Sequence, residues 1–221
     1  MDKVSTKFMS SGTKNGKPIV LIIDYGAGNL RSVANAILSL GYEPKITTSG
    51  KDIKGAKAVI LPGVGAAAEA MDSLRRLGMI EPILRYIADD RPFFGVCLGL
   101  QVLFSSTEEG GWQDCLGIIP GRVKRLPSTL KTPHMGWNQL RQIKKHPVFE
   151  GIADSTNFYF VHSYHAVPDD RSVILGETDY GINICGAIVM GNLVATQFHP
   201  EKSGKPGLRL YQNFLTRATR Q

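Results

Sequence analysis

The chain has 221 residues, of which 43% are hydrophobic and 20% are charged. This length favours one large domain, and the composition excludes a disordered or fibrous chain. No apolar run approaches the ~20 residues that a membrane-spanning helix needs, so we expect no membrane association. The net charge of +7 is spread too widely for a nucleic-acid-binding face, which would concentrate it.

The first 18 residues differ from the rest, because they are polar and carry four lysines against one aspartate. They lack both an apolar segment and arginine, so we expect a flexible basic tail rather than a signal or transit peptide. Residues 19–221 show no repeat or linker and are expected to form a single domain. Cys97, Cys115 and Cys185 form no Cys-x-x-Cys pair, which argues against disulfides or a zinc site and favours the cytoplasm.

Short apolar strands alternate with helical patterns in the first half of the chain. Strands are expected at residues 19–24, 44–48, 58–61 and 92–96, and helices at 30–38, 66–77 and 81–88. This alternation predicts an α/β fold with an open, mostly parallel sheet flanked by helices.

The second half of the chain contains mainly strand-like runs separated by turn residues. These runs cover residues 121–126, 137–141, 158–164, 172–176 and 187–190. They predict an antiparallel extension of the same sheet. One more strand at 193–198 and a helix at 208–216 complete the predicted domain.

The strongest candidate for chemistry is Cys97, which lies between an apolar strand and a helical pattern. Glycines stand two residues before and two residues after it, as in the sharp strand-to-helix turn of a nucleophile elbow. The reactive form of cysteine is the thiolate, and the amino end of a helix stabilises that charge. We therefore predict that Cys97 is a nucleophile; the alternative is a buried cysteine in a tight turn.

His199 is the predicted proton carrier for this thiol. It follows the strand expected at 193–198, and Glu201 comes two residues later. Because side chains two residues apart on an extended backbone point the same way, Glu201 can orient the imidazole. Cys97, His199 and Glu201 are thus the predicted catalytic triad for cleavage of an amide.

Two backbone N–H groups are expected to form an oxyanion hole. Leu98 supplies one because it follows the nucleophile, and Val64 supplies the other from a turn at the end of a different strand. Gln101 projects from the same helix face as Cys97 and could contact a bound amide.

No cofactor is expected. The glycine-containing loop at 26–29 lacks the third glycine of a dinucleotide fingerprint, since that position is Arg31. A metal site built on His162 and His165 would lack carboxylate partners, so we expect no metal.

Together these residues resemble the class I, triad-type glutamine amidotransferases, and more narrowly the glutaminase subunits of imidazole glycerol phosphate synthase. The resemblance covers residues 19–218. Its motifs are DYGAGNL at 24–30, PGVG at 62–65, GVCLGLQ at 95–101, HMGWN at 134–138, YFVHSY at 159–164 and QFHPEKS at 197–203. The cysteine elbow and His-Pro-Glu are shared by the whole class, whereas the opening loop, PGVG and HMGWN are typical of the narrower group.

The resemblance implies that Cys97 attacks the side-chain amide of glutamine and that water then hydrolyses the glutamyl thioester, with His199 as general acid and base. It also implies a set of glutamine-binding residues, namely Gly63, Gly65, Gln101, Glu109, His162, Ser163 and Tyr164. Glu109 would meet the substrate ammonium, and the stretch 162–164 would meet its carboxylate.

The same resemblance implies that ammonia passes to a separate (β/α)8 cyclase subunit, in a heterodimer that serves histidine biosynthesis. Asn29, Trp137 and Lys202 would contact this partner, although Trp137 could instead be a packing residue. Two other functions stay open, a glutaminase subunit of another synthase, such as that of pyridoxal phosphate, and a non-catalytic regulatory protein on the same fold. The PGVG turn argues against the pyridoxal phosphate group, which typically carries Gly-Gly-Glu-Ser there.

Overall fold

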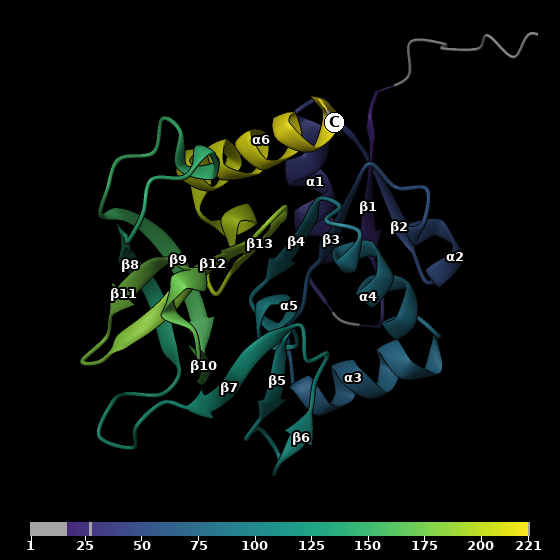
Figure 1. Cartoon of the computed structure of the whole chain (residues 1–221). Helices are drawn as coiled ribbons and strands as arrows, with labels where there is room; N and C mark the ends of the chain where they lie inside the picture. Colours follow the sequence, from purple (N-terminus) through teal and green to yellow (C-terminus); the bar gives the residue numbers. More distant parts are fainter. Residues whose placement is uncertain (1–16, 27, 221) are drawn as a thin grey trace, which may run out of the picture.

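The computed structural model describes residues 17–26 and 28–220 of the chain. Most of the predicted basic tail, residues 1–16, lies outside these ranges. The described residues form a nine-stranded sheet and a four-stranded sheet, and helices cover both faces of the larger one (Figure 1). None of the described helices is long and apolar enough to cross a membrane.

One half of the larger sheet is parallel, as the alternating pattern predicts. Its strands lie in the order β2-β1-β3-β4-β13. Their bounds are Ile19–Ile23 (β1), Glu43–Thr47 (β2), Ala58–Leu61 (β3), Phe93–Val96 (β4) and Leu193–Thr196 (β13). All neighbours among these five strands are parallel, so their carboxyl ends meet at one edge of the sheet.

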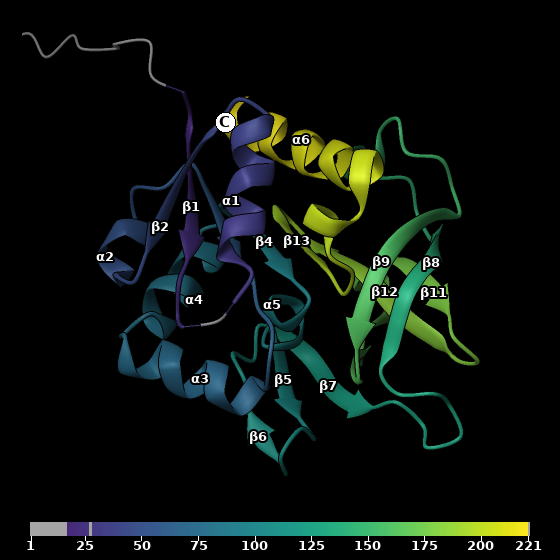
Figure 2. The same cartoon turned by 180° about the vertical axis from the view of Figure 1, so that it is seen from behind.

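Helices pack on both faces of the parallel half. They are α1 (Leu30–Ser39), α2 (Gly50–Ile53), α3 (Ala67–Arg76), α4 (Ile80–Ala88), α5 (Leu98–Gln101) and α6 (Gly204–Arg220). The helices α1 and α6 cover one face, and α3 and α4 cover the other (Figure 2). Alternate residues of a strand serve the two faces: Leu21 of β1 packs in the core under α3 and α4, whereas Ile22 packs under α1 and α6. Burial on both sides explains why these strands are continuous apolar runs.

The other half of the larger sheet is antiparallel and confirms the predicted extension. It continues from β13 in the order β12-β11-β8-β9. The bounds are His134–Gln142 (β8), Thr156–His162 (β9), Ile174–Asp179 (β11) and Asn183–Met190 (β12). Short 3-10 turns lie at Pro147–Phe149 (η1), Arg171–Val173 (η2) and Pro200–Lys202 (η3).

A separate four-stranded sheet was not predicted. Its order is β10-β7-β5-β6, with bounds Phe104–Thr107 (β5), Gln113–Asp114 (β6), Ile119–Arg125 (β7) and Tyr164–Pro168 (β10). The strand expected at 158–164 is divided at Ser163, so β9 belongs to the larger sheet and β10 to the smaller one. Nδ1 of His162 lies 2.9 Å from the carbonyl oxygen of Tyr164, and this local hydrogen bond holds the chain at the break.

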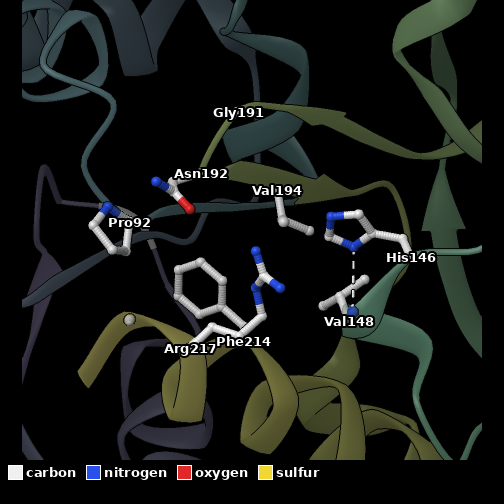
Figure 3. Close-up of a pocket in the computed structure, with 9 residues that line it drawn as sticks. Pro92, His146, Val148, Gly191, Asn192, Val194, Phe214 and Arg217 are labelled. Carbon is white, nitrogen blue, oxygen red and sulfur yellow. Dashed lines mark hydrogen bonds between the residues drawn. The ribbon is translucent and has the colours of Figure 1, made fainter. Parts of the chain in front are cut away.

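A small hollow lies at the amino edge of the sheet, where β4 and β13 begin (Figure 3). Its volume is about 10 Å³, which is room for about one water molecule. His146 lines it and accepts a hydrogen bond from the N–H of Val148 at 3.2 Å. Burial and the nearby Arg217 and Lys144 lower the pKa of this imidazole. The hollow is too small for a metabolite, and open α/β sheets bind ligands at the opposite, carboxyl edge.

Candidate active site

Cys97 lies at the carboxyl end of β4, where the chain turns directly into α5. Its backbone has φ 53° and ψ −103°, a conformation that costs a non-glycine residue about 1–3 kcal/mol. The flanking glycines permit this turn. A Cβ on Gly99 would lie 1.9 Å from the carbonyl oxygen of Leu61, and a Cβ on Gly95 would lie 2.7 Å from the carbonyl oxygen of Gly99. The turn therefore has the geometry of a nucleophile elbow.

His199 and Glu201 follow the neighbouring strand β13. Nδ1 of His199 lies 2.7 Å from Oε1 of Glu201, and the two side chains are 1% and 0% exposed. The expected contact is thus present, but the expected reason for it is wrong. Residues 200–202 form the 3-10 turn η3 instead of continuing as an extended chain. Ser203 fixes this turn because its hydroxyl donates to the carbonyl oxygen of His199 at 2.6 Å.

The charges in this cluster favour a protonated His199. Burial alone would lower the pKa of the imidazole, but interactions with Cys97 and Glu201 raise it to about 10. Nδ1 faces the carboxylate. The other nitrogen, Nε2, is buried and makes no hydrogen bond of ordinary geometry with a described residue, but Cys97 is close enough to raise the pKa of the ring. An imidazolium beside a cysteine is the arrangement that gives a thiolate at neutral pH.

Further groups hold the Glu201 carboxylate. The side-chain amide of Asn29 donates to Oε1, and the hydroxyl of Tyr211 donates to Oε2 at 3.4 Å. Burial and the Glu201 carboxylate raise the pKa of Tyr211 well above its usual range. Asn29, which was predicted at the partner interface, therefore also contacts the third member of the predicted triad.

A pocket of about 510 Å³ opens beside Cys97, within the usual size range of small-molecule sites. Cys97, Leu98 and His199 line it. Most of the predicted substrate-binding residues line it as well, namely Gly65, Gln101, Glu109, His162, Ser163 and Tyr164. Gly63 does not line the pocket.

The turn after β3 forms part of the pocket wall. Val64, a predicted oxyanion-hole residue, lines the pocket and is 37% exposed. Gly63 is buried behind it, where a Cβ would lie 2.3 Å from the Tyr25 hydroxyl and 2.8 Å from the Cβ of Leu98. Burial and the charge of Cys97 raise the pKa of Tyr25 far above its usual range. This close packing brings the turn, which carries Val64, against the amino end of α5, where Leu98, the other predicted N–H donor, lies.

Glu109 joins the pocket from the loop after β5. Its Oε2 accepts a hydrogen bond of 2.7 Å from the N–H of Ala67 at the start of α3. Burial raises the pKa of this carboxyl, and the negative charge of Glu69 adds to the increase, while the hydrogen bond opposes it. A half-buried carboxylate in a pocket wall is suited to bind an ammonium group.

Two buried histidines form a hydrogen-bonded pair that was not predicted. Nδ1 of His134 lies 2.9 Å from Nε2 of His162, whose Nδ1 contacts the carbonyl oxygen of Tyr164. Since a carbonyl oxygen only accepts, His162 carries its proton on Nδ1. The amide nitrogen of Asn138 donates to Nε2 of His134 at 3.2 Å, so His134 carries its proton on Nδ1 and donates to Nε2 of His162. Both rings are therefore neutral. Burial also favours the neutral form of both rings, because it lowers the pKa of His134 to about 4 and that of His162 to about 3.

Gln197 is the residue at this site that the sequence analysis did not single out. It is fully buried, and its Nε2 lies 3.5 Å from Sγ of Cys97. Its Oε1 accepts a hydrogen bond of 3.0 Å from Nε2 of Gln101. A sequence signal was present, because Gln197 lies in the strand expected at 193–198, two positions before His199; in the structure β13 ends at Thr196.

An apolar surface lies on the outer face of β8. Trp137 is 59% exposed and Met135 is 66% exposed, so the alternative that Trp137 is a packing residue of the core is wrong. Trp137 pairs with Tyr159 of β9, and the carbonyl oxygen of Tyr159 accepts the N–H of His199 at 3.0 Å. This surface is therefore one strand away from the predicted triad. Lys202 is exposed and lines the pocket itself.

The other two cysteines show no sign of activation. All three cysteines are free, and burial raises the pKa of Cys115 to about 11 and that of Cys185 to about 12. In the part of the chain that the structure describes, no group of three or more His, Cys, Asp or Glu side chains could hold a metal ion.

The family model "Glutamine amidotransferase class-I" matches residues 21–218. The chain belongs to this family. Among related amidotransferase sequences, the "Imidazole glycerol phosphate synthase subunit HisH" of Dehalococcoides mccartyi (strain CBDB1) is 56% identical over 90% of this chain and 98% of the relative. The protein of the same name from Moorella thermoacetica is 49% identical over 88% of this chain and 93% of the relative. That from Syntrophotalea carbinolica is 47% identical over 89% of this chain and 98% of the relative.

Solved structures show the same fold. A crystal structure of a glutamine amidotransferase superposes with a TM-score of 0.72 at 22% identity, covering 90% of this chain and 98% of that one. The structure of PurLQS from Thermotoga maritima gives 0.72 at 19% identity, covering 91% and 99%. The predicted α/β fold, the amidotransferase family and the resemblance to imidazole glycerol phosphate synthase subunits are thus confirmed.

Proposed function

We propose that this amidotransferase is the glutaminase subunit of an imidazole glycerol phosphate synthase and that it releases ammonia from glutamine for histidine biosynthesis. The observation that carries the proposal is the placement of Cys97 with the buried His199–Glu201 pair beside a pocket of about 510 Å³. The three relatives at 47–56% identity, each named as a subunit of that synthase, support the choice of synthase.

In the first half-reaction the thiolate of Cys97 attacks the side-chain amide carbon of glutamine. The oxyanion that forms accepts hydrogen bonds from the backbone N–H groups of Leu98 and Val64. The His199 imidazolium gives its Nε2 proton to the departing nitrogen, so that ammonia leaves and a γ-glutamyl thioester remains on Cys97.

In the second half-reaction the neutral His199 accepts a proton from a water molecule that attacks the thioester. The tetrahedral intermediate collapses to the γ-carboxylic acid of glutamate and the Cys97 thiolate, and His199 is again an imidazolium. The acid then loses its proton to the solvent. Throughout, the Glu201 carboxylate accepts a hydrogen bond from Nδ1–H of His199, so that Nε2 stays directed at the reacting atoms. The hydrogen bonds from Asn29 and Tyr211 keep this carboxylate in place.

The pocket walls suit the two charged ends of glutamine. Glu109 faces the ammonium group of glutamine. Residues 162–164, where the chain passes from β9 to β10, face its α-carboxylate with their backbone. Gly65 lines the wall at the amide end, and Gly63 is buried behind it, where it leaves room for the turn to pack against Leu98. Gln101 uses its N–H groups for Tyr164 and Gln197, while its oxygen accepts no hydrogen bond from the described residues and can meet the substrate amide.

The ammonia would pass to a (β/α)8 cyclase subunit in a cytoplasmic heterodimer. Met135 and Trp137 supply an exposed apolar surface next to the site, of the kind that a partner covers. Asn29 and Lys202 lie at the triad and at the pocket, so a partner that contacts them would touch the catalytic machinery directly.

The test is glutamate release from glutamine by the purified chain, alone and with the cyclase subunit and its nucleotide ligand. We expect low activity alone, a sharp increase with partner and ligand, and none in Cys97→Ser, whereas the matched variant Cys115→Ser keeps full activity. No glutamate release under either condition would contradict the proposal.

A further inference from the structure

Gln197 lies directly after β13, and none of its surface is exposed. Its main chain is fixed by a hydrogen bond of 2.9 Å from its N–H to the carbonyl oxygen of Gly186. The side chain lies between Gln101 and Cys97, with Oε1 at 3.0 Å from one and Nε2 at 3.5 Å from the sulfur of the other. Gln197 does not line the pocket, so its partner is the nucleophile rather than the substrate.

The direction of these hydrogen bonds follows from the main-chain carbonyl of Tyr164. A carbonyl oxygen only accepts, so the atom of Gln101 that contacts it at 2.9 Å is Nε2. The same nitrogen lies 3.0 Å from Gln197, and the atom that it meets there must be the oxygen. The N–H group of Gln197 therefore faces the sulfur of Cys97. The opposite orientation of either carboxamide would place two donors or two acceptors against each other.

A donor at this sulfur favours one protonation state. Among the described residues, the carbonyl oxygen of Val161 lies 3.9 Å from Sγ as an acceptor for the thiol proton, and His199 can accept that proton when its imidazole is neutral. A thiolate, in contrast, accepts the N–H of Gln197, and a hydrogen bond to the charged form of a group favours that form. We propose that Gln197 is a positioning residue, which stabilises the Cys97 thiolate and fixes the direction of its sulfur. That the stabilised thiolate attacks glutamine rests on the proposed function, whereas its stabilisation by Gln197 does not.

Gln197 acts differently from the ionisable groups around it. Those that act on Cys97, on its partner His199 or in the pocket are His199, Glu201, Tyr25, His162, Glu109, Tyr164 and Lys202. Each of them changes charge with pH, whereas a carboxamide does not. Removal of Gln197 should therefore shift the titration of the thiol along the pH axis without changing the number of protons involved.

The test is the pH dependence of alkylation of Cys97 by iodoacetamide in the full chain, followed on the Cys97 peptide by mass spectrometry. Gln197→Leu removes the donor, and we expect it to raise the apparent thiol pKa by about one unit, a roughly tenfold loss of thiolate below that pKa. Gln197→Glu replaces the donor with a carboxylate and should raise the pKa further. Gln212→Leu removes a glutamine in α6 that does not line the pocket and whose partners are Tyr42 and Thr216, and it should match the unmodified protein.

Coincident alkylation profiles for the unmodified protein and both Gln197 variants would overturn the proposal. If circular dichroism shows that these variants do not fold, Gln101→Leu replaces them. That substitution leaves the donor in place but frees the Gln197 carboxamide to rotate, so a smaller shift in the same direction is expected. The absence of any shift in Gln101→Leu would then overturn the proposal as well.

Steady-state kinetics provide a second readout that a purely structural role would not move. Because Gln197 does not line the pocket, Gln197→Leu should lower kcat for glutamine hydrolysis about tenfold and leave KM within about twofold. A raised KM at unchanged kcat would contradict the positioning role. Alkylation needs no turnover, so an unshifted profile refutes this inference alone, whereas absence of turnover in the unmodified protein refutes the proposed function.

Discussion

Replacing Cys97 by glycine should leave the protein more stable than replacing it by alanine. Both substitutions remove the thiol and its contacts, so the two variants differ only in the Cβ. At φ 53° and ψ −103° the backbone of a residue with a Cβ is strained by about 1–3 kcal/mol, and glycine avoids this strain. Glycine in turn loses about 0.5–1 kcal/mol of stability, because its unfolded chain has more conformational freedom than that of alanine. We expect the glycine variant to be more stable by roughly 1 kcal/mol, and by at most about 2.5 kcal/mol.

The assay is urea unfolding of the two variants, followed by circular dichroism at one pH. A difference of this size corresponds to about 2–4 °C in Tm for a chain of this length. The matched control is Cys185, a buried cysteine in β12 without a positive φ, where the alanine variant should be the more stable one. An alanine variant at Cys97 that equals or exceeds the glycine variant would refute the argument that the elbow holds backbone strain.

Four further predictions concern the site and its surroundings. Gly99→Ala should lower both stability and glutamine hydrolysis, because its methyl group would overlap a carbonyl of β3. The control Gly55→Ala should change neither, because its methyl group would meet nothing within 4 Å. If the two variants behave alike in urea unfolding and in glutamate release, the close approach at Gly99 is unimportant. His199→Ala should lower kcat by about 10²–10⁴ and Glu201→Gln by less, and near-normal rates for both would exclude the triad. Because the pKa of His199 is raised to about 10 from 6.5, its stabilising charge is fully present below about pH 6.5 and is lost as the pH rises towards 10. Glu201→Gln should flatten this decline in urea unfolding, and an unchanged slope would contradict the assigned cause. Trp137→Ala should weaken cyclase binding. It should change the free energy of unfolding by less than about 0.5 kcal/mol, since the side chain is 59% exposed. Unchanged binding in calorimetry would show that Trp137 is not part of the interface.

The parallel half of the sheet and the elbow could be predicted because each depends on a short stretch of sequence. Strands buried on both faces are continuous apolar runs, and β1, β3 and β4 are such runs. The glycine spacing around Cys97 is equally local. It reflects two close approaches of the chain, which leave no room for a Cβ at Gly95 or Gly99.

Features that depend on distant segments could not be predicted. The hydrogen bond between Asn29 and Glu201 joins residues 172 positions apart. The division at Ser163 was missed because both halves of the stretch alternate like one strand, and only the two different sheets separate them. The contact between His199 and Glu201 was predicted from an extended backbone, but the 3-10 turn η3 provides it.

The role of Gln197 depends on a similar long-range arrangement. Its neighbour Gln101 is 96 positions away, and the orientation of both carboxamides is set by the carbonyl of Tyr164 in a different sheet. The sequence shows only that Gln197 stands two positions before His199, and it cannot show which of its atoms meets the sulfur.

The central claim is that Cys97 carries the glutamyl group during turnover. The most direct measurement mixes the full chain, with its cyclase partner, with glutamine, quenches the mixture in acid within the first turnovers, and analyses the Cys97 peptide by mass spectrometry. The account predicts a γ-glutamyl thioester on Cys97 that forms as ammonia is released and decays to glutamate. Release of ammonia at full rate with Cys97 unmodified at every quench time, and retained in Cys97→Ser, would contradict it.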